Sequence, residues 1–186
     1  MKRTFVAIKI ELQPAFQELI GKLKRSLDGE KIRWVIPENF HLTLHFFGNT
    51  EADDVAVLIE LFQDFAEAEP PINFKLKAIS FFKKRLQPKV LFVDVAEADE
   101  LEKLAEKLHE VLVDKGFAKA EHAFHPHLTV ARIKHLDDKE RFLQVLKQFS
   151  ESPEQLVEAT ELVFYESVVR PDGPVYRPIK TFELNG

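Results

Sequence analysis

The chain contains no cysteine, no long apolar run and no excess of positive charge. The absence of cysteine excludes disulfides and thiolate metal sites, and it suits a reducing compartment. No apolar run approaches the roughly 18 residues of a membrane span. The apolar run near the start is interrupted at Lys9 and Glu11, too early for a signal peptide. These absences predict a cytoplasmic protein that does not associate with membranes.

The charge balance limits the kind of nucleic-acid protein that this chain could be. Its 26 Lys and Arg residues against 31 Asp and Glu give a net charge of −5, which argues against a coat protein for nucleic acid. A small basic groove that holds one end of a strand remains compatible with that charge. The 186 residues suffice for one domain with its own core, and no linker or low-complexity tract divides them.

Strand and helix patterns are mixed along the chain, which favours an α+β fold over a doubly wound parallel sheet. Apolar spacing predicts helices over about 14–28, 51–69, 99–115 and 139–149. Thr50 is the expected cap of the second helix, and Gly116 is the expected stop of the third. Strands are expected over 5–10, 32–36, 41–47, 72–82, 89–95, 127–133, 156–169 and 175–184. The basic segment 83–88 is the expected connector between two of them.

Two short strands carry polar residues at alternate positions. In "HLTLHFF" the two-residue period of a strand predicts that His41, Thr43 and His45 share one face. One such strand is equally consistent with a half-solvated sheet face. However, "HLTV" repeats the pattern with His127 and Thr129, close to half the chain away. The repeat suggests a duplicated unit whose two His-x-Thr faces converge across a cleft.

Two histidines and two hydroxyls suit metal-free cleavage of a phosphodiester. Imidazole has an ordinary pKa of about 6.5, so one ring can act as the general base and the other as the general acid. A threonine two residues along the same strand face can donate a hydrogen bond to a phosphate oxygen, and its β-branch suits a strand. We found no glycine-rich phosphate loop and no cysteine or serine nucleophile motif that would indicate another chemistry.

A metal site is the competing interpretation of these histidines. His41 with His45, or His125 and His127 with His122 nearby, could supply imidazole ligands. Against a metal site, the repeated unit is His-x-Thr rather than His-x-His, and a metal leaves both threonines unexplained.

Aromatic residues offer weaker candidates for the site. Phe81, Phe82 and the following basic residues could stack on a base and attract phosphates, or they could be a buried pair beside a solvated charge run. Tyr176 could line the groove or pack beside it, and Trp34 is expected in the core or in the cleft wall.

The paired motifs, with the flanking segments "TFVAIKI", "RWVIPENFHLTLHFFG", "KVLFVDV" and "YESVVRPDGPVY", resemble the 2H phosphoesterases. Within that superfamily the chain is similar to the RNA 2′,3′-cyclic phosphodiesterases first described as 2′–5′ RNA ligases. The resemblance implies a LigT-like α+β fold, in which duplicated β-α-β units form two pseudo-symmetric lobes with antiparallel sheets around a central groove. Residues 1–186 would then be a single domain of two intertwined lobes, with one motif in each half.

The resemblance also implies a role for each motif residue. His41 would protonate the leaving 3′-oxygen, His127 would activate water, and Thr43 and Thr129 would hold phosphate oxygens. Arg132 matches the family's arginine five residues after the second histidine and would also bind the phosphate.

Strict alternation conflicts with this role for Arg132, because it places the residue on the face of Leu128 and Val130, away from the motif. A β-bulge or the strand's end near Ala131 would reconcile the two expectations.

The expected reaction is therefore hydrolysis of a terminal RNA 2′,3′-cyclic phosphate to a 2′-phosphate, without a metal or other cofactor. Two alternatives remain open at this stage. One is 2′–5′ RNA ligation through the same site, and the other is a non-catalytic module that binds RNA ends or nucleotides. Expected substrates are RNA ends, including tRNA fragments, or small cyclic nucleotides. We expect a monomer, since no unexplained apolar stripe stands out.

Overall fold

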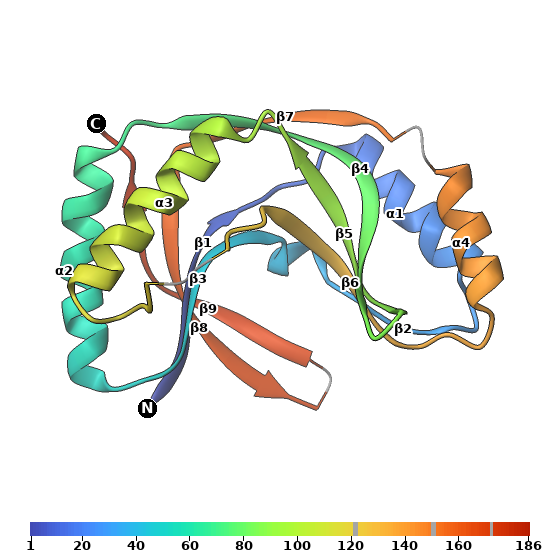
Figure 1. Cartoon of the computed structure of the whole chain (residues 1–186), viewed down its shortest axis with the longest axis horizontal. Coiled ribbons are helices and arrows are strands. Elements are labelled where there is room, and N and C mark those ends of the chain that lie inside the picture. Colours follow the sequence, from blue (N-terminus) through green and yellow to red (C-terminus); the bar gives the residue numbers. More distant parts are fainter. Residues whose placement is uncertain (121–122, 150–151, 172) are drawn as a thin grey trace.

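The computed structural model describes residues 1–120, 123–149, 152–171 and 173–186. Two antiparallel sheets form the molecule, and helices cover their outer faces (Figure 1). The α+β prediction is confirmed. No helix in the described part of the chain is long and apolar enough to cross a membrane.

The first sheet has the strand order β3-β1-β8-β9. Its strands are β1 (Lys2–Lys9), β3 (His41–Thr50), β8 (Glu161–Arg170) and β9 (Gly173–Glu183). The second sheet has the order β2-β6-β5-β4-β7. Its strands are β2 (Lys31–Trp34), β4 (Ile72–Lys84), β5 (Gln87–Ala96), β6 (His127–His135) and β7 (Glu154–Ala159).

The two sheets repeat one arrangement. In the first sheet β1 lies between β3 and β8, and in the second β5 lies between β6 and β4. After the first motif strand, β3, and its following helix, the chain crosses to the second sheet, where β2 already lies, and forms β4 to β7 there. After the second motif strand, β6, it returns to the first sheet at β8, which pairs with β1. Duplicated and intertwined units would give such an exchange of strands.

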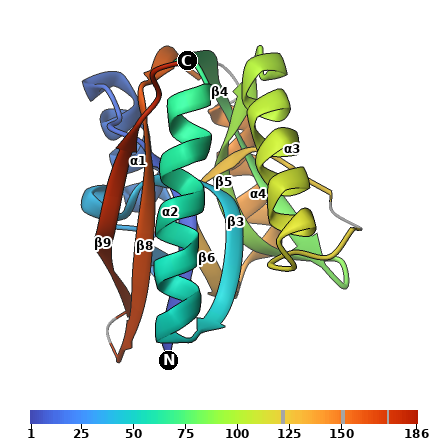
Figure 2. The same cartoon turned by 90° about the vertical axis from the view of Figure 1, so that its left-hand side faces the viewer.

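The helices are α1 (Pro14–Ser26), α2 (Ala52–Ala68), α3 (Asp99–Asp114) and α4 (Lys139–Gln148). Each buries an apolar stripe of the kind that a 3.6-residue period predicts; in α2 the stripe includes Leu58, Phe62 and Phe65. Helix α2 lies along the outer face of the first sheet (Figure 2). Helices α2 and α3 lie at one end of the molecule and α1 and α4 at the other (Figure 1).

Helix α3 ends as its sequence predicts. Gly116 adopts a φ of +78°, a left-handed conformation that costs glycine little. Its N–H donates to the Val113 carbonyl and the Phe117 N–H donates to the Leu112 carbonyl, which satisfies two carbonyls at the helix end.

Three local expectations are wrong. Thr50 does not cap α2: its hydroxyl lies 2.6 Å from that of Thr4, and Glu51 holds the cap position without a side-chain bond. Segment 83–88 is not a loose connector, because strands β4 and β5 extend into it and leave a two-residue turn at Arg85–Leu86. Segment 156–169 is two strands in different sheets, since the chain leaves the second sheet after Ala159 and enters the first at Glu161.

Candidate active site

His41 is the first residue of β3 and follows a 3₁₀ turn at Pro37–Asn39. Its Nδ1 lies 2.7 Å from the backbone oxygen of Asn39. A carbonyl oxygen only accepts, so Nδ1 carries the proton and Nε2 is the nitrogen available to a ligand. The Asn39 side chain in turn donates to the backbone oxygen of Pro174, at 3.1 Å. This bond ties the turn before His41 to the start of β9.

His127 repeats this arrangement at the start of β6. Its Nδ1 lies 2.7 Å from the backbone oxygen of His125, which also is two residues earlier in the chain. The second imidazole therefore also presents Nε2 to a ligand. At the sequence level His125 is a candidate only as a metal ligand, and its contribution here comes from its backbone oxygen, which side-chain identity does not reveal.

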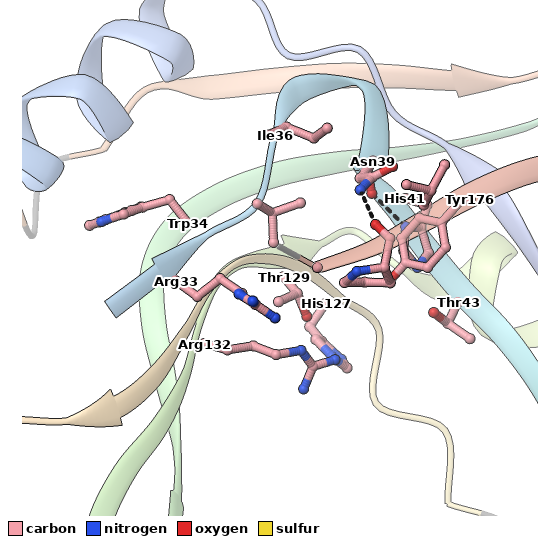
Figure 3. Close-up of a pocket in the computed structure, with 14 residues that line it drawn as sticks. Arg33, Trp34, Ile36, Asn39, His41, Thr43, His127, Thr129, Arg132 and Tyr176 are labelled. Carbon is pink, nitrogen blue, oxygen red and sulfur yellow. Dashed lines mark hydrogen bonds between the residues drawn. The ribbon is translucent and has the colours of Figure 1, made fainter. Parts of the chain in front are cut away.

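Both histidines line one pocket of about 240 Å³ between the two sheets (Figure 3). The first sheet contributes His41 and Thr43 from β3 and residues 173–176 from β9. The second contributes His127, Thr129 and Arg132 from β6 and the segment 33–36 at the end of β2. The structure thus brings the five predicted site residues together.

A β-bulge in β6 turns Arg132 toward the pocket. Opposite β5, Thr129 pairs with Phe92 but Ala131 pairs with Leu91, so Val130 is an extra residue in the ladder. Val130 and Ala131 are both buried as a result, and the alternation shifts by one position. Arg132 therefore returns to the face of Thr129, which resolves the conflict between strict alternation and the position of this arginine.

An equivalent bulge in β3 removes His45 from the site. Ala7 pairs with Thr43 but Val6 pairs with His45, so Leu44 is the extra residue. The His45 ring contacts Phe47 at 4.7 Å between centroids, on the side of the sheet that faces the helices. The expectation that His45 shares a face with the motif is wrong, and so is its pairing with His41 in a metal site.

Aromatic rings surround His41 and explain its electrostatics. The centroids of Phe5 and Tyr176 lie 4.9 and 5.0 Å from that of the imidazole. Burial among these rings lowers the pKa of His41, and the nearby positive charges of Arg132 and His127 lower it further, while the bond to Asn39 opposes them. The neutral imidazole is thus favoured in the free protein.

His127 also has aromatic neighbours. The centroid of its ring lies 4.9 Å from that of Phe82 and 5.6 Å from that of Phe92, and the ring planes are steeply inclined in both pairs. Phe82 is 38% exposed and stacks on Phe92, whereas Phe81 packs against Phe142 of α4. The sequence leaves open whether these two phenylalanines are buried or stack on a base. Phe81 is packed against the core, whereas Phe82 is exposed beside a motif histidine.

Three other side chains of the pocket wall are Tyr176, Trp34 and Arg33. Tyr176 and Trp34, whose places the sequence did not decide, both line the pocket, and Trp34 also packs against the core. Arg33 was not predicted, and no motif in the sequence distinguishes it. It pairs with Arg132 across the β2–β6 ladder, and the two side chains lie next to each other (Figure 3). Its guanidinium donates to the Pro171 backbone oxygen at 3.0 Å, across the groove from β2.

No cluster of three or more histidine, aspartate or glutamate side chains in a metal-binding arrangement occurs within the described residues. His122, one of the candidate metal ligands, lies outside the described residues.

Comparisons with known proteins agree with the fold. The chain matches the model of the 2′-5′ RNA ligase superfamily over residues 6–169. A protein of Thermotoga maritima named RNA 2′,3′-cyclic phosphodiesterase is 31% identical over 187 aligned positions, which cover 99% of this chain and 96% of that protein. A protein of the same name from Aquifex aeolicus is 30% identical, with 92% and 93% coverage.

Solved structures show the same fold. A protein of Thermus thermophilus superimposes with a TM-score of 0.77 at 22% identity, covering 99% of this chain and 98% of the other. E. coli LigT, in a complex with 3′-AMP, gives a TM-score of 0.70 at 22% identity, with 100% and 99% coverage.

The architecture is thus that of a two-sheet α+β protein with one His-x-Thr strand from each sheet at a shared pocket. The chain belongs to the 2′-5′ RNA ligase superfamily.

Proposed function

We propose that this protein is a metal-independent RNA 2′,3′-cyclic phosphodiesterase that leaves a 2′-phosphate. The observation that carries the proposal is the shared pocket, in which His41 and His127 each have Nδ1 bound to a backbone carbonyl and Nε2 available to a ligand. The names of the relatives from Thermotoga maritima and Aquifex aeolicus support the same activity.

The chemistry requires one proton acceptor and one proton donor. Nε2 of neutral His127 takes a proton from water as the water oxygen bonds to phosphorus. The bond between phosphorus and the 3′-oxygen breaks, and protonated His41 gives its Nε2 proton to that oxygen. The products are a 2′-phosphate and a free 3′-hydroxyl. Proton exchange with solvent then restores neutral His127 and protonated His41.

His41 can act as the general acid only if substrate binding raises its pKa. In the free protein, burial lowers the pKa of His41 and so favours its neutral form. A bound phosphodiester brings a negative charge between the imidazoles, which favours the protonated form of His41 and offsets the positive charge of Arg132. Substrate binding is therefore expected to raise the pKa of His41 and to supply the proton that the leaving oxygen needs.

Thr43 and Thr129 would bind the non-bridging phosphate oxygens, and Arg132 would offset the charge that develops on them. Each threonine is two residues from its histidine and lines the same pocket. Because Thr43 and Thr129 come from different sheets, one phosphate bound by both would be held from two sides.

The test uses an RNA oligonucleotide that ends in a 2′,3′-cyclic phosphate, with excess chelator present. We expect turnover, and ³¹P NMR of the product should show a 2′-phosphate. His127→Ala should reduce turnover by at least about a hundredfold, since it removes the general base. His135→Ala is the matched control, because this histidine lies at the far end of the same strand and is largely exposed. Full activity of His127→Ala would refute the mechanism.

The two alternatives are distinguished when an RNA with a 5′-hydroxyl is added to the assay. A 2′–5′ ligase would join RNA halves that carry the cyclic phosphate and a 5′-hydroxyl, using the same two histidines in the reverse direction. Water at about 55 M favours hydrolysis in dilute solution, so we expect hydrolysed product to exceed joined product. A non-catalytic module would bind the RNA end without turnover.

A further inference from the structure

Arginine rather than lysine gathers around the candidate active site. The chain has eight arginines and 18 lysines. Four arginines line the pocket or the hollow that adjoins it, and no lysine of the described chain does; these four are Arg3, Arg33, Arg132 and Arg170. A guanidinium can bind a phosphate with two parallel hydrogen bonds, whereas lysine acts as a point charge.

The adjoining hollow has a volume of about 300 Å³ and begins at the site itself, since His41, Thr43 and Arg132 line both spaces. From there it continues along β1 and β8 of the first sheet to Arg3 and Arg170. It therefore provides a path that leads away from the two histidines along one lobe.

This path is positive in a protein whose net charge is −5. No aspartate or glutamate of the described residues lines the pocket or the hollow. On β8 the acidic residue nearest in sequence to Arg170 is Glu166, and its carboxylate is bound by the Lys2 ammonium group at 3.1 Å. Neither Arg3 nor Arg170 forms an ion pair with a described residue. Two exposed guanidiniums without acidic partners in the described part of the chain point to an anionic ligand.

The Arg3 side chain also has a defined position. Its guanidinium carbon lies 4.9 Å from the centroid of the Phe46 ring, in the geometry of a cation–π contact. Phe46 is five residues after His41, as Arg132 is after His127, and the two bulges turn both positions toward the groove. Arg3 thus supplies, from β1, a cation beside the position that is equivalent to Arg132.

We propose that Arg3 and Arg170 bind the backbone phosphates of the RNA on the 5′ side of the cyclic phosphate, so that the preferred substrate is an oligonucleotide rather than a single cyclic nucleotide. This inference rests on the proposed function. The nucleotide that carries the cyclic phosphate has its next phosphate on the 5′-oxygen, and in a strand each earlier nucleotide adds another. A path lined by arginines that starts at the histidines matches this repeating charge.

A second basic surface provides the competing route. The tip of the β4–β5 hairpin carries Lys83, Lys84 and Arg85, all exposed, near Phe82 and His127. None of these three basic residues lines the pocket or the hollow at His41. Variants of the two surfaces therefore distinguish the two routes.

The experiment compares adenosine 2′,3′-cyclic phosphate with the trinucleotide that ends in the same group, and reports the ratio of their kcat/KM values. We expect the wild type to favour the trinucleotide. The double variant Arg3→Gln with Arg170→Gln should lower this ratio about tenfold or more, chiefly through a higher KM for the trinucleotide. It should also make trinucleotide turnover less dependent on salt. The slope of log(kcat/KM) against log salt concentration should become less negative by about 0.7 for each lost phosphate contact.

Arg177→Gln with Lys180→Gln is the charge-matched control, because both residues are exposed on β9 of the same sheet but do not line the pocket or the hollow. It should leave the ratio at the wild-type value, and the melting temperature of each variant reports its folding. An unchanged ratio in the double variant would overturn the proposal, as would a loss found only in Lys84→Gln with Arg85→Gln.

Failure of the proposed function has a separate signature, which is that wild-type protein turns over neither substrate. In that case fluorescence anisotropy with a labelled trinucleotide still decides the inference. Weaker binding by the Arg3→Gln, Arg170→Gln variant than by the Arg177→Gln, Lys180→Gln variant supports binding of RNA phosphates by Arg3 and Arg170, and equal binding refutes it.

Discussion

Substitution of His41 by alanine should have an effect that depends on the leaving group. The bond from Nδ1 to the Asn39 carbonyl leaves Nε2 as the nitrogen that can protonate the 3′-oxygen. The 3′-oxygen of ribose is a poor leaving group and needs that proton. In a p-nitrophenyl phosphodiester the leaving group is a stabilised anion and does not need it. His41→Ala should therefore damage the first reaction far more than the second.

The expected size follows from the role of a single general acid. Such a group contributes about 10² to 10⁴ in rate, or roughly 2.7 to 5.5 kcal/mol of transition-state stabilisation. With the activated ester the loss in His41→Ala should be about tenfold or less, because the remaining groups, His127, Thr43, Thr129 and Arg132, still line the pocket. His127→Ala should be impaired with both substrates, since each reaction needs a base to activate water.

The assay measures kcat/KM for both substrates across pH in the wild type and in both variants. In the wild type, kcat/KM for the cyclic phosphate should fall as the pH rises through the pKa of His41, which burial places below the ordinary value of about 6.5. This limb should be absent in His41→Ala. An equal loss by His41→Ala with both substrates would refute the assignment of His41 as the acid.

Three further predictions concern charge, packing and phosphate binding. By NMR, His41 should titrate below about 6.5, and Arg132→Gln should raise its pKa, because it removes a positive charge; an unchanged pKa would contradict the electrostatic account. Phe62→Ala should lower the free energy of urea unfolding by about 3–5 kcal/mol, because Phe62 is fully buried. Replacement of the exposed Val57 on the same helix by alanine should lower the free energy of unfolding by less than about 1 kcal/mol; equal losses in the two variants would contradict the burial of Phe62 in the core. Thr129→Val should lower kcat/KM about tenfold, while Thr129→Ser should retain most activity; a matching loss in both would exclude the hydroxyl as the reason.

The repeated tetrapeptides made much of the site predictable. A histidine and a threonine two residues apart must share a strand face as long as the strand is regular, and His41 with Thr43 and His127 with Thr129 do so. The alternation cannot show where regularity ends. The bulges at Leu44 and Val130 shift it, so that His45 leaves the groove and Arg132 enters it. Both bulged residues are ordinary apolar residues of a strand, and their sequence gives no sign of the irregularity.

Other features depend on contacts between distant segments. Arg33 reaches the pocket because β2 lies beside β6 and faces the β8–β9 hairpin, where it binds the Pro171 carbonyl. The division between β7 and β8 is hidden because the change of sheet occurs within the single residue Thr160, a β-branched residue that gives no turn signal. The turn at Arg85–Leu86 has positive φ angles of 49° and 64° at residues that rarely adopt them, so no turn signal marks it.

The central claim is that imidazoles from two different sheets act on one phosphate. A crystal structure of the protein with adenosine 2′-phosphate, the type of product expected, tests it most directly. We predict that Nε2 of His41 and Nε2 of His127 both lie within hydrogen-bonding distance of oxygens on the same phosphorus or of the 3′-oxygen beside it. A phosphate that contacts one imidazole while the other faces solvent would contradict the account.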